Sequence, residues 1–413
     1  MKVKGFPRED SRLLTEMVRK CVHCGFCNST CPSYKVLGNE LDGPRGRIHL
    51  ITDLVRGESN DAIIRTHLDT CLTCRNCVAT CPSGIEYGKI IALGRELAHA
   101  KFGRPLGDRL KRGVLLRLLS HPSMAGALLG LAGRMAWLLP RGLRRSLPRR
   151  ERLWPLLNAS PCTRKVACLE GCVQPGLTPN TNRALHNLLV RLGIELVPLG
   201  LSSCCGAFAH HSDRPDKART QALAIMHTAQ RRFTEGCEAL VMTSSACVLE
   251  MREYPWLLRG DTAAKAQAED FSRKVMDPSS LITPEAITAL GIKTNASVAF
   301  HPPCTLQHGQ GAERAGAVDE LLQAAGLTLA PIAERNLCCG SAGVYSIMQP
   351  GVANRLREEK LANIIATRAD FVATANVGCQ FFLQQGLGER QRVWHWIELL
   401  EHLANKADMR YEH

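Results

Sequence analysis

The chain has 413 residues, a formal net charge of +14 and 19 cysteines, with 45% hydrophobic but only 5% aromatic residues. This composition excludes a wholly disordered chain and an integral membrane protein, and the length allows two or three domains with their own cores. Small secreted proteins use cysteine as heavily but are much shorter, and the first residues lack a secretory signal pattern, so we expect reduced, intracellular thiols that bind a ligand.

Residues 1–100 are predicted to form a helical domain with two clusters of cysteines. The run Cys-x2-Cys-x2-Cys-x3-Cys-Pro occurs twice. In bacterial ferredoxins with this spacing, three thiolates of one run and the fourth of the other hold each [4Fe-4S] cluster. Zinc also accepts four thiolates, but zinc sites need neither the third cysteine nor the proline. The expected ligands are Cys21, Cys24, Cys27 and Cys81 for the first cluster, and Cys71, Cys74, Cys77 and Cys31 for the second.

Residues 101–160 are predicted to form a basic helical segment. From Lys101 to Arg152, thirteen residues are Lys or Arg and two are acidic. The longest uncharged run is shorter than the roughly 20 apolar residues of a membrane-spanning helix, so we do not expect this segment to cross a bilayer. Two interpretations stay open: a basic face that docks on anionic lipid or an acidic partner, or a solvated linker. No nucleic-acid-binding motif accompanies the charge, so no nucleic acid partner is expected.

An internal repeat follows, with residues 161–260 as the first copy, 261–295 as a connector, and 296–413 as the second copy with a C-terminal tail. Both copies contain a single cysteine, then Cys-Cys-Gly, then another single cysteine, with similar flanking residues. Short apolar strands alternate with helical stretches in each copy, which predicts two α/β domains with parallel sheets. Each repeated cysteine then follows the carboxyl end of a strand, where open α/β sheets bind ligands.

The repeated cysteines are a second set of candidate metal ligands. Adjacent cysteines do not readily form an unstrained disulfide with each other, but both can approach one metal cluster, and the following glycine allows close backbone approach. Buried structural cysteines are the alternative. Four thiolates per copy would hold a cluster at one or both sites. The two sets are Cys172, Cys204, Cys205 and Cys247, and Cys304, Cys338, Cys339 and Cys379.

Other candidate residues are assigned no role in these sites. Cys162, Cys168 and Cys237 are expected to be core or incidental cysteines, and the histidines near the repeated cysteines are expected to be ordinary loop residues. No G-x-G-x-x-G sequence follows a predicted strand, so the sequence predicts no flavin or nicotinamide site on this chain and no catalytic side chain of its own.

Two ferredoxin runs followed by two Cys-Cys-Gly units resemble, over nearly the whole chain, the iron-sulfur subunits of glycolate oxidase (glycolate dehydrogenase). Related families are the corresponding iron-sulfur subunits of anaerobic glycerol-3-phosphate dehydrogenase, the iron-sulfur proteins of lactate utilisation and the heterodisulfide reductases. In heterodisulfide reductases each unit ends in C-x2-C, whereas Ser244 and Asn376 stand at the corresponding positions here. This departure favours electron relay over disulfide cleavage.

The resemblance implies that an FAD-containing partner subunit oxidises glycolate to glyoxylate and that this chain passes the electrons towards a membrane quinone. It implies no activity on glycolate for the isolated chain, and a cytoplasmic protein held peripherally at the inner membrane. Three alternatives stay open: the iron-sulfur subunit of a lactate or anaerobic glycerol-3-phosphate dehydrogenase, a self-contained disulfide reductase, and a zinc scaffold without redox activity.

Overall fold

The computed structural model describes residues 6–59, 61–120, 151–158, 162–310 and 316–411. Contacts between residues divide the chain into two compact bodies. The first body comprises Met1–Val114, His211–Asp213 and Asn336–Lys360; the second comprises Leu115–His210, Arg214–Arg335 and Leu361–His413. The first body therefore includes a segment of the second cysteine repeat.

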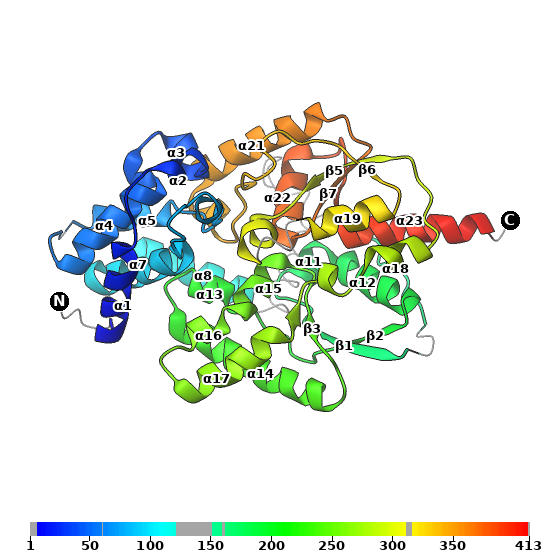
Figure 1. Cartoon of the computed structure of the whole chain (residues 1–413), viewed down its shortest axis with the longest axis horizontal. Helices are drawn as coiled ribbons and strands as arrows, with labels where there is room; N and C mark the ends of the chain where they lie inside the picture. The colour runs from blue at the N-terminus through cyan, green and yellow to red at the C-terminus, as the bar shows by residue number, and fades with distance from the viewer. Residues whose placement is uncertain (1–5, 60, 121–150, 159–161, 311–315, 412–413) are drawn as a thin grey trace. The chain divides into compact units, whose positions relative to one another are not determined.

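The first body is helical throughout its described residues (Figure 1). Pro32 and Pro44 each stand at the first position of a helix, where the missing N–H costs nothing. The helices pack their apolar sides on a common core that includes Leu14, Ile51 and Ile90. Its elements are α1 (Arg8–Arg19), α2 (Phe26–Ser29), α3 (Pro32–Leu37), η1 (Glu40–Asp42), α4 (Pro44–Arg56), α5 (Ile63–Asp69), α6 (Asn76–Ala79), α7 (Tyr87–Phe102), the start of α8 (Leu106–Ser120), α20 (Tyr345–Met348) and the start of α21 (Pro350–Ala366).

The first cysteine repeat forms a parallel sheet in the second body. Strands β1 (Arg164–Cys168), β2 (Ile194–Pro198), β3 (Leu240–Val241) and β4 (Val275–Met276) pair in the order β2-β1-β3-β4. The connections contain α11 (Gln174–Leu177), α12 (Pro179–Arg191), α13 (Ala207–His210), α14 (Pro215–Thr234), α15 (Ser245–Arg252), α16 (Tyr254–Leu257) and α17 (Thr262–Arg273).

The segment 261–295, expected as a connector, contributes structure of its own. It carries α17, the edge strand β4, η3 (Pro278–Ser280) and α18 (Pro284–Ala289). Val275 is buried and pairs with Leu240 of β3, so β4 completes the first sheet. A strand of two residues is too short for a periodic pattern in the sequence to reveal it.

The second repeat builds a second parallel sheet with the same strand order. Strands β5 (Ser297–His301), β6 (Thr328–Leu329), β7 (Phe371–Thr374) and β8 (Val393–His395) pair as β6-β5-β7-β8. The equal order confirms the prediction of two copies of one α/β unit with parallel sheets. The remaining elements are η4 (Thr305–Gly309), α19 (Ala317–Ala324), α22 (Val377–Leu387) and α23 (Trp396–Tyr411).

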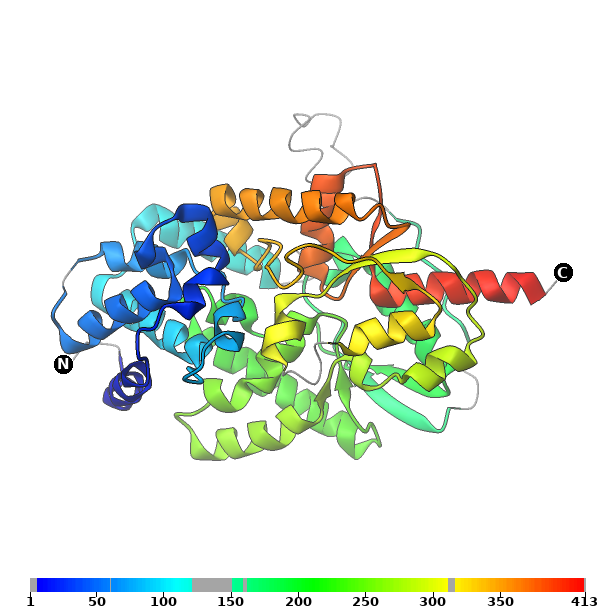
Figure 2. The ribbon, with the colours of Figure 1, turned by 45° about the horizontal axis from the view of Figure 1, so that its top comes forward.

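The two repeats share one hydrophobic core within the second body. Val166 and Leu185 of the first copy and Phe300 and Ile397 of the second belong to the same cluster of buried side chains. Helix α23 packs beside α12 and α19 (Figures 1 and 2). At this contact the buried carboxylate of Glu401 accepts a hydrogen bond from Asn187, at 3.1 Å. The two α/β repeats therefore pack against each other through a shared set of buried side chains.

Part of the basic segment lies in the described structure, and two of its arginines pair with carboxylates. Arg104 lies within 3.0 Å of carboxylate oxygens of Asp69, Asp108 and Asp213, and its side chain is 4% exposed. Arg112 of α8 pairs with Asp69 and Asp108. Residues 121–150, on which the docking interpretation largely depends, lie outside the described residues. Over the described part of the chain, no helix combines the length and apolar character that crossing a bilayer requires.

We predict that Arg104→Ala lowers the free energy of unfolding by about 3 kcal/mol at neutral pH, because it leaves buried carboxylates without their main partner. Burial alone would raise the pKa of Asp69, but the hydrogen bond and charge of Arg104 outweigh it and lower the pKa. A lowered folded-state pKa gives stabilisation that is present above the unfolded value of about 3.9 and is lost as the pH falls through the folded value. The difference between wild type and variant should therefore shrink in acid.

Urea unfolding of the anaerobically purified protein at several pH values measures this effect. Arg109→Ala is the matched control, because Arg109 is an exposed residue of the neighbouring helix α8, and it should change stability by less than about 0.5 kcal/mol. Equal effects of the two substitutions would contradict a stabilising role for the Arg104 cluster.

Candidate metal centres

The two ferredoxin-type runs fold into the same loop. In both, the residues that flank the second cysteine of the run have positive φ. The values are 54° for His23 and 84° for Gly25 in the first run, and 53° for Thr73 and 62° for Arg75 in the second. Such conformations are unfavourable for residues other than glycine and concentrate at functional sites. They turn backbone N–H groups into a concavity that favours an anionic group such as a thiolate-bound iron-sulfur cluster.

Each loop contributes to a pocket that contains one of the predicted four-cysteine sets. The first pocket is lined by Cys21, Cys24, Cys27 and Cys81. The second pocket is lined by Cys71, Cys74, Cys77 and Cys31. Cys77 also lines the first pocket, so the two pockets adjoin. The structure thus brings each expected set together, although which cysteines ligate iron stays a prediction.

A contact between the two runs places each fourth cysteine beside the opposite loop. The hydroxyls of Thr30 and Thr80, which directly precede Cys31 and Cys81, lie 3.0 Å apart. Asn76, beside Cys77, donates a hydrogen bond to the Thr30 carbonyl at 3.1 Å. The loops of the two runs therefore pack directly against each other.

The two pockets differ in burial. All four cysteines of the second set are buried, whereas Cys24 of the first set is exposed and Cys21, Cys27 and Cys81 are half-buried. Burial, with the neighbouring Cys21, raises the pKa of Cys27 to about 11, and burial also raises the pKa of Cys77 well above its usual range. Thiolates crowded in such sites need cationic partners, and iron ions fit this requirement. The backbone N–H of Thr73 also donates to the Cys71 sulfur at 3.4 Å, as iron-sulfur sites commonly show.

The first Cys-Cys-Gly set forms a compact group of four sulfurs in the second body. Cys172, Cys204 and Cys205 are buried and Cys247 is half-buried. Hydrogen bonds from the Cys172 and Cys205 thiols hold the pKa of Cys204 well below its usual range, and Cys205 also contacts Cys247. The Tyr254 hydroxyl donates to the Cys205 carbonyl at 2.7 Å and fixes this loop. A stabilised thiolate among three further sulfurs fits a metal cluster better than a hydrophobic core.

The glycine of each Cys-Cys-Gly sequence was expected to allow close backbone approach, and its conformation and surroundings agree. Gly206 has φ +96° and Gly340 has φ +90°, in the left-handed region. A side chain on Gly340 would lie 2.5 Å from the Ala353 carbonyl oxygen, and one on Gly206 would lie 3.4 Å from that of Ala218. Each glycine therefore lets the cysteine loop pass close to the helix that follows.

The second Cys-Cys-Gly set is distributed over both bodies. Cys338 and Cys339 belong to the first body, while Cys304 and Cys379 belong to the second. Within the second body, a ring nitrogen of His301 and the Cys379 sulfur lie within 4.8 Å of each other. His301 was expected to be an ordinary loop histidine, but it is fully buried at the end of β5. Ligation of a cluster by this set stays a prediction.

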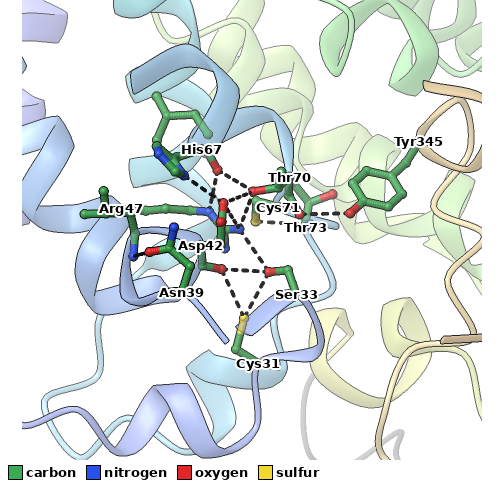
Figure 3. Close-up of polar contacts among 12 residues, drawn as sticks. Cys31, Ser33, Asn39, Asp42, Arg47, His67, Thr70, Cys71, Thr73 and Tyr345 are labelled. Carbon is green, nitrogen blue, oxygen red and sulfur yellow. Dashed lines mark hydrogen bonds and ion pairs between the residues drawn. The ribbon is translucent and has the colours of Figure 1, made fainter. Parts of the chain in front are cut away.

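The segment that contains Cys338 and Cys339 is anchored to the ferredoxin-type region of the first body. The Tyr345 hydroxyl donates to the Thr70 carbonyl at 3.0 Å (Figure 3). Asn336 contacts Asn76 at 3.5 Å, and Arg355 donates to the Val36 carbonyl at 3.3 Å. Thr70 directly precedes Cys71, so this segment supports the second pocket.

The three unassigned cysteines and His210 belong to none of the four-cysteine sets. Cys168 is buried in β1, where burial raises its pKa to about 12, and Cys237 is buried while Cys162 is half-buried. His210 pairs with Glu250 at 2.9 Å, with both side chains nearly buried.

The sequence analysis did not single out Arg47 and Tyr87, although both line the second pocket. Arg47 stands in Pro44-Arg45-Gly46-Arg47 at the start of α4, where arginine usually indicates a solvated helix face. Gly46 was the one local sign in the sequence that this turn is tightly packed. A side chain on Gly46 would lie 2.1 Å from the Glu40 carbonyl oxygen, so the chain passes very close to itself here.

Comparisons with known proteins agree with this division of the chain. A family model described as a 4Fe-4S dicluster domain matches residues 17–85, and one described as a cysteine-rich domain matches residues 166–252 and 298–384. The dicluster match indicates iron-sulfur clusters as cofactors of this chain.

Relatives match over most of the chain. The glycolate oxidase iron-sulfur subunit of Escherichia coli (strain K12) is 38% identical over 406 residues, which cover 97% of this chain and 98% of that protein. The probable glycolate oxidase iron-sulfur subunit of Bacillus subtilis (strain 168) is 28% identical and covers 92% of both chains. Lactate utilization protein A of Exiguobacterium sp. (strain ATCC BAA-1283 / AT1b) is 28% identical over 59% of this chain and 99% of its own length. The chain thus belongs to the family of glycolate oxidase iron-sulfur subunits, which are oxidoreductase components with an iron-sulfur electron-transfer role.

Proposed function

We propose that this chain relays electrons from an FAD-containing partner subunit, which oxidises glycolate to glyoxylate, towards a membrane quinone. The observation that carries the proposal is the pair of adjoining four-cysteine pockets in the first body. When bound there, two [4Fe-4S] clusters would supply one-electron transfer between a two-electron flavin and the acceptor. The chain itself would hold the thiolates, exclude water from the second pocket and provide N–H groups to sulfur.

The ligands that we propose for the two clusters are the sets that line the pockets. The first pocket is the more accessible, because Cys24 is exposed, while the cysteines of the second pocket are buried. Exchange of electrons with another subunit is favoured at the accessible pocket, where a partner approaches more closely. The first Cys-Cys-Gly set would hold a further cluster, because its four sulfurs already lie together.

Glycolate is favoured over lactate as the partner's substrate by the extent of the similarity. The relative named for glycolate oxidase matches 97% of this chain, whereas the lactate utilization protein matches 59% at lower identity. Anaerobic glycerol-3-phosphate dehydrogenase stays the other alternative, because the substrate site would lie on the partner chain. No flavin-binding motif was found in this sequence, which supports a separate flavin subunit.

A self-contained disulfide reductase is disfavoured by the residues that replace the missing thiols. Asn376 precedes α22, and its side-chain oxygen accepts a hydrogen bond from the Gly378 N–H at 2.8 Å. Ser244 stands at the same position before α15. Asparagine and serine are preferred at helix N-termini, whereas a thiol is a weak acceptor. Asn376 thus caps its helix, Ser244 occupies the same N-terminal position without a side-chain cap, and neither position supplies a fifth thiol to its four-cysteine set.

We also propose that the chain is cytoplasmic and peripherally associated with the inner membrane through its partners or through charge. The pairing of Arg104 and Arg112 with carboxylates removes two basic side chains from this role. The contact therefore depends on the remaining basic residues of 101–152, part of which lie outside the described residues.

The exchange of the fourth ligand can be tested by single substitutions. Cys31→Ala and Cys74→Ala should each remove the second cluster and leave the same residual EPR spectrum after reduction. Cys24→Ala and Cys81→Ala should leave the complementary spectrum. Each should lower the iron content by about four irons per chain, the content of one [4Fe-4S] cluster.

Cys162→Ala is the matched control for these variants, because this cysteine belongs to no proposed set, and it should retain the full spectrum. If Cys31→Ala instead shared its residual spectrum with Cys24→Ala, each run would hold its own cluster, and the proposed exchange would be wrong.

The proposed reaction predicts that glycolate reduces the chain only in the presence of its partner. Anaerobic addition of glycolate to the complex purified through a tag on this chain should bleach the iron-sulfur absorbance, and the isolated chain should not respond. Reduction by lactate or glycerol 3-phosphate but not by glycolate would reassign the substrate. Reduction of a disulfide by the isolated chain would replace the proposal with the reductase alternative.

A further inference from the structure

Arg47 is a fully buried arginine beside the second four-cysteine pocket. Charged side chains are almost never fully buried unless other groups compensate them. Its guanidinium donates from Nε to the His67 carbonyl at 2.8 Å, and from Nη2 to the hydroxyls of Ser33 and Thr70 at 2.9 and 2.8 Å (Figure 3). All three acceptors are neutral oxygens, so these hydrogen bonds hold the guanidinium in place without cancelling its charge.

The nearest carboxylate given for Arg47 is that of Asp42, and this pair is not in direct contact. The Asp42 Oδ1 atom lies 4.0 Å from Nη2. The same oxygen accepts the Thr70 hydroxyl at 2.6 Å and lies 3.0 Å from the His67 ring nitrogen. The carboxylate is thus held by other groups and compensates Arg47 only in part.

Two hydroxyls connect Arg47 to different sulfurs of the pocket. The Ser33 hydroxyl, which accepts from Arg47, lies 3.3 Å from the Cys31 sulfur. The Tyr87 hydroxyl, another hydrogen-bond partner of Arg47, donates to the Cys71 sulfur at 3.9 Å. Because arginine keeps its proton in proteins, the guanidinium is a permanent cation at this position.

The first pocket has an arginine of a different kind. Arg45, two residues before Arg47, lines that pocket, but its side chain is 38% exposed and pairs directly with Glu40 at 2.7 Å. Water and the carboxylate screen its charge, whereas the charge of Arg47 acts in a region of low dielectric constant. The sequence Pro-Arg-Gly-Arg therefore gives the two pockets unequal electrostatic environments.

We propose that Arg47 is a positioning residue whose buried charge raises the reduction potential of the cluster held by Cys31, Cys71, Cys74 and Cys77. This inference rests on the ligand set of the proposed function. Reduction adds one negative charge to a cluster, and a nearby buried cation stabilises the reduced form. Burial without the cation would have the opposite effect, because a low dielectric constant disfavours added charge. Arg47 thereby allows a buried cluster to accept an electron.

The test is a redox titration monitored by EPR on full-length protein purified anaerobically with its clusters. Arg47→Gln removes the charge, and the equilibrium constant for reduction of one cluster should fall at least about tenfold, which is 59 mV for one electron. Arg47→Lys retains the charge and should restore most of the loss. Arg56→Gln is the matched control, because Arg56 is exposed at the end of the same helix and lines neither pocket, and it should leave both potentials nearly unchanged.

The outcomes separate this inference from the proposed function. If the wild type lacks two clusters by iron content, the proposed ligand sets fail before Arg47 is tested. If Arg47→Gln retains both clusters with unchanged potentials, the inference is overturned. If Arg47→Gln does not load the second cluster, the inference is tested with Ser33→Ala and Tyr87→Phe instead. Each removes one connecting hydroxyl and should lower the same potential, and unchanged potentials in both would overturn the inference.

Discussion

Each four-cysteine pocket is lined by three cysteines of one ferredoxin-type run and the fourth cysteine of the other run. This sharing of cysteines constrains the rest of the first body. The contact between Thr30 and Thr80 fixes the two loops against each other, so the helices before and after them must be placed together. His23, Thr73 and Arg75 have strained backbone conformations at matching positions of the two loops. Such strain persists where the surrounding structure imposes it. The relay function thus depends on a fold that closes both pockets at once.

Buried charged groups have different surroundings in different parts of the molecule. Arg104 holds carboxylates together in a structural cluster, whereas Arg47 donates to neutral oxygens beside two cysteine sulfurs. In the second body, the buried carboxylates of Glu398 and Glu401 lie where the two repeats meet and accept hydrogen bonds from Thr181 and Asn187. Buried charged or carboxyl groups with specific partners therefore occur at two structural contacts and beside a proposed redox site.

The sequence alone predicted those features that depend on the spacing of cysteines. The ferredoxin runs predicted the sets that line both pockets, and the repeated Cys-Cys-Gly sequences predicted two similar parallel sheets. Three features could not be predicted from the sequence. Strand β4 is too short to give a pattern, Arg47 looks like an ordinary surface residue of a helix, and the placement of Tyr345 beside Thr70 depends on packing between segments far apart in the chain. Such contacts leave no local signal, because each residue alone is common in other contexts.

The central claim is that the first body holds two [4Fe-4S] clusters. Its most direct test is to determine iron and acid-labile sulfide in protein purified anaerobically, together with the EPR spectrum after reduction. The account predicts at least about eight irons and eight sulfides per chain, with signals from two clusters. A content above this value would show that a Cys-Cys-Gly set is also loaded. A content near four irons, or zinc in place of iron, would contradict the account.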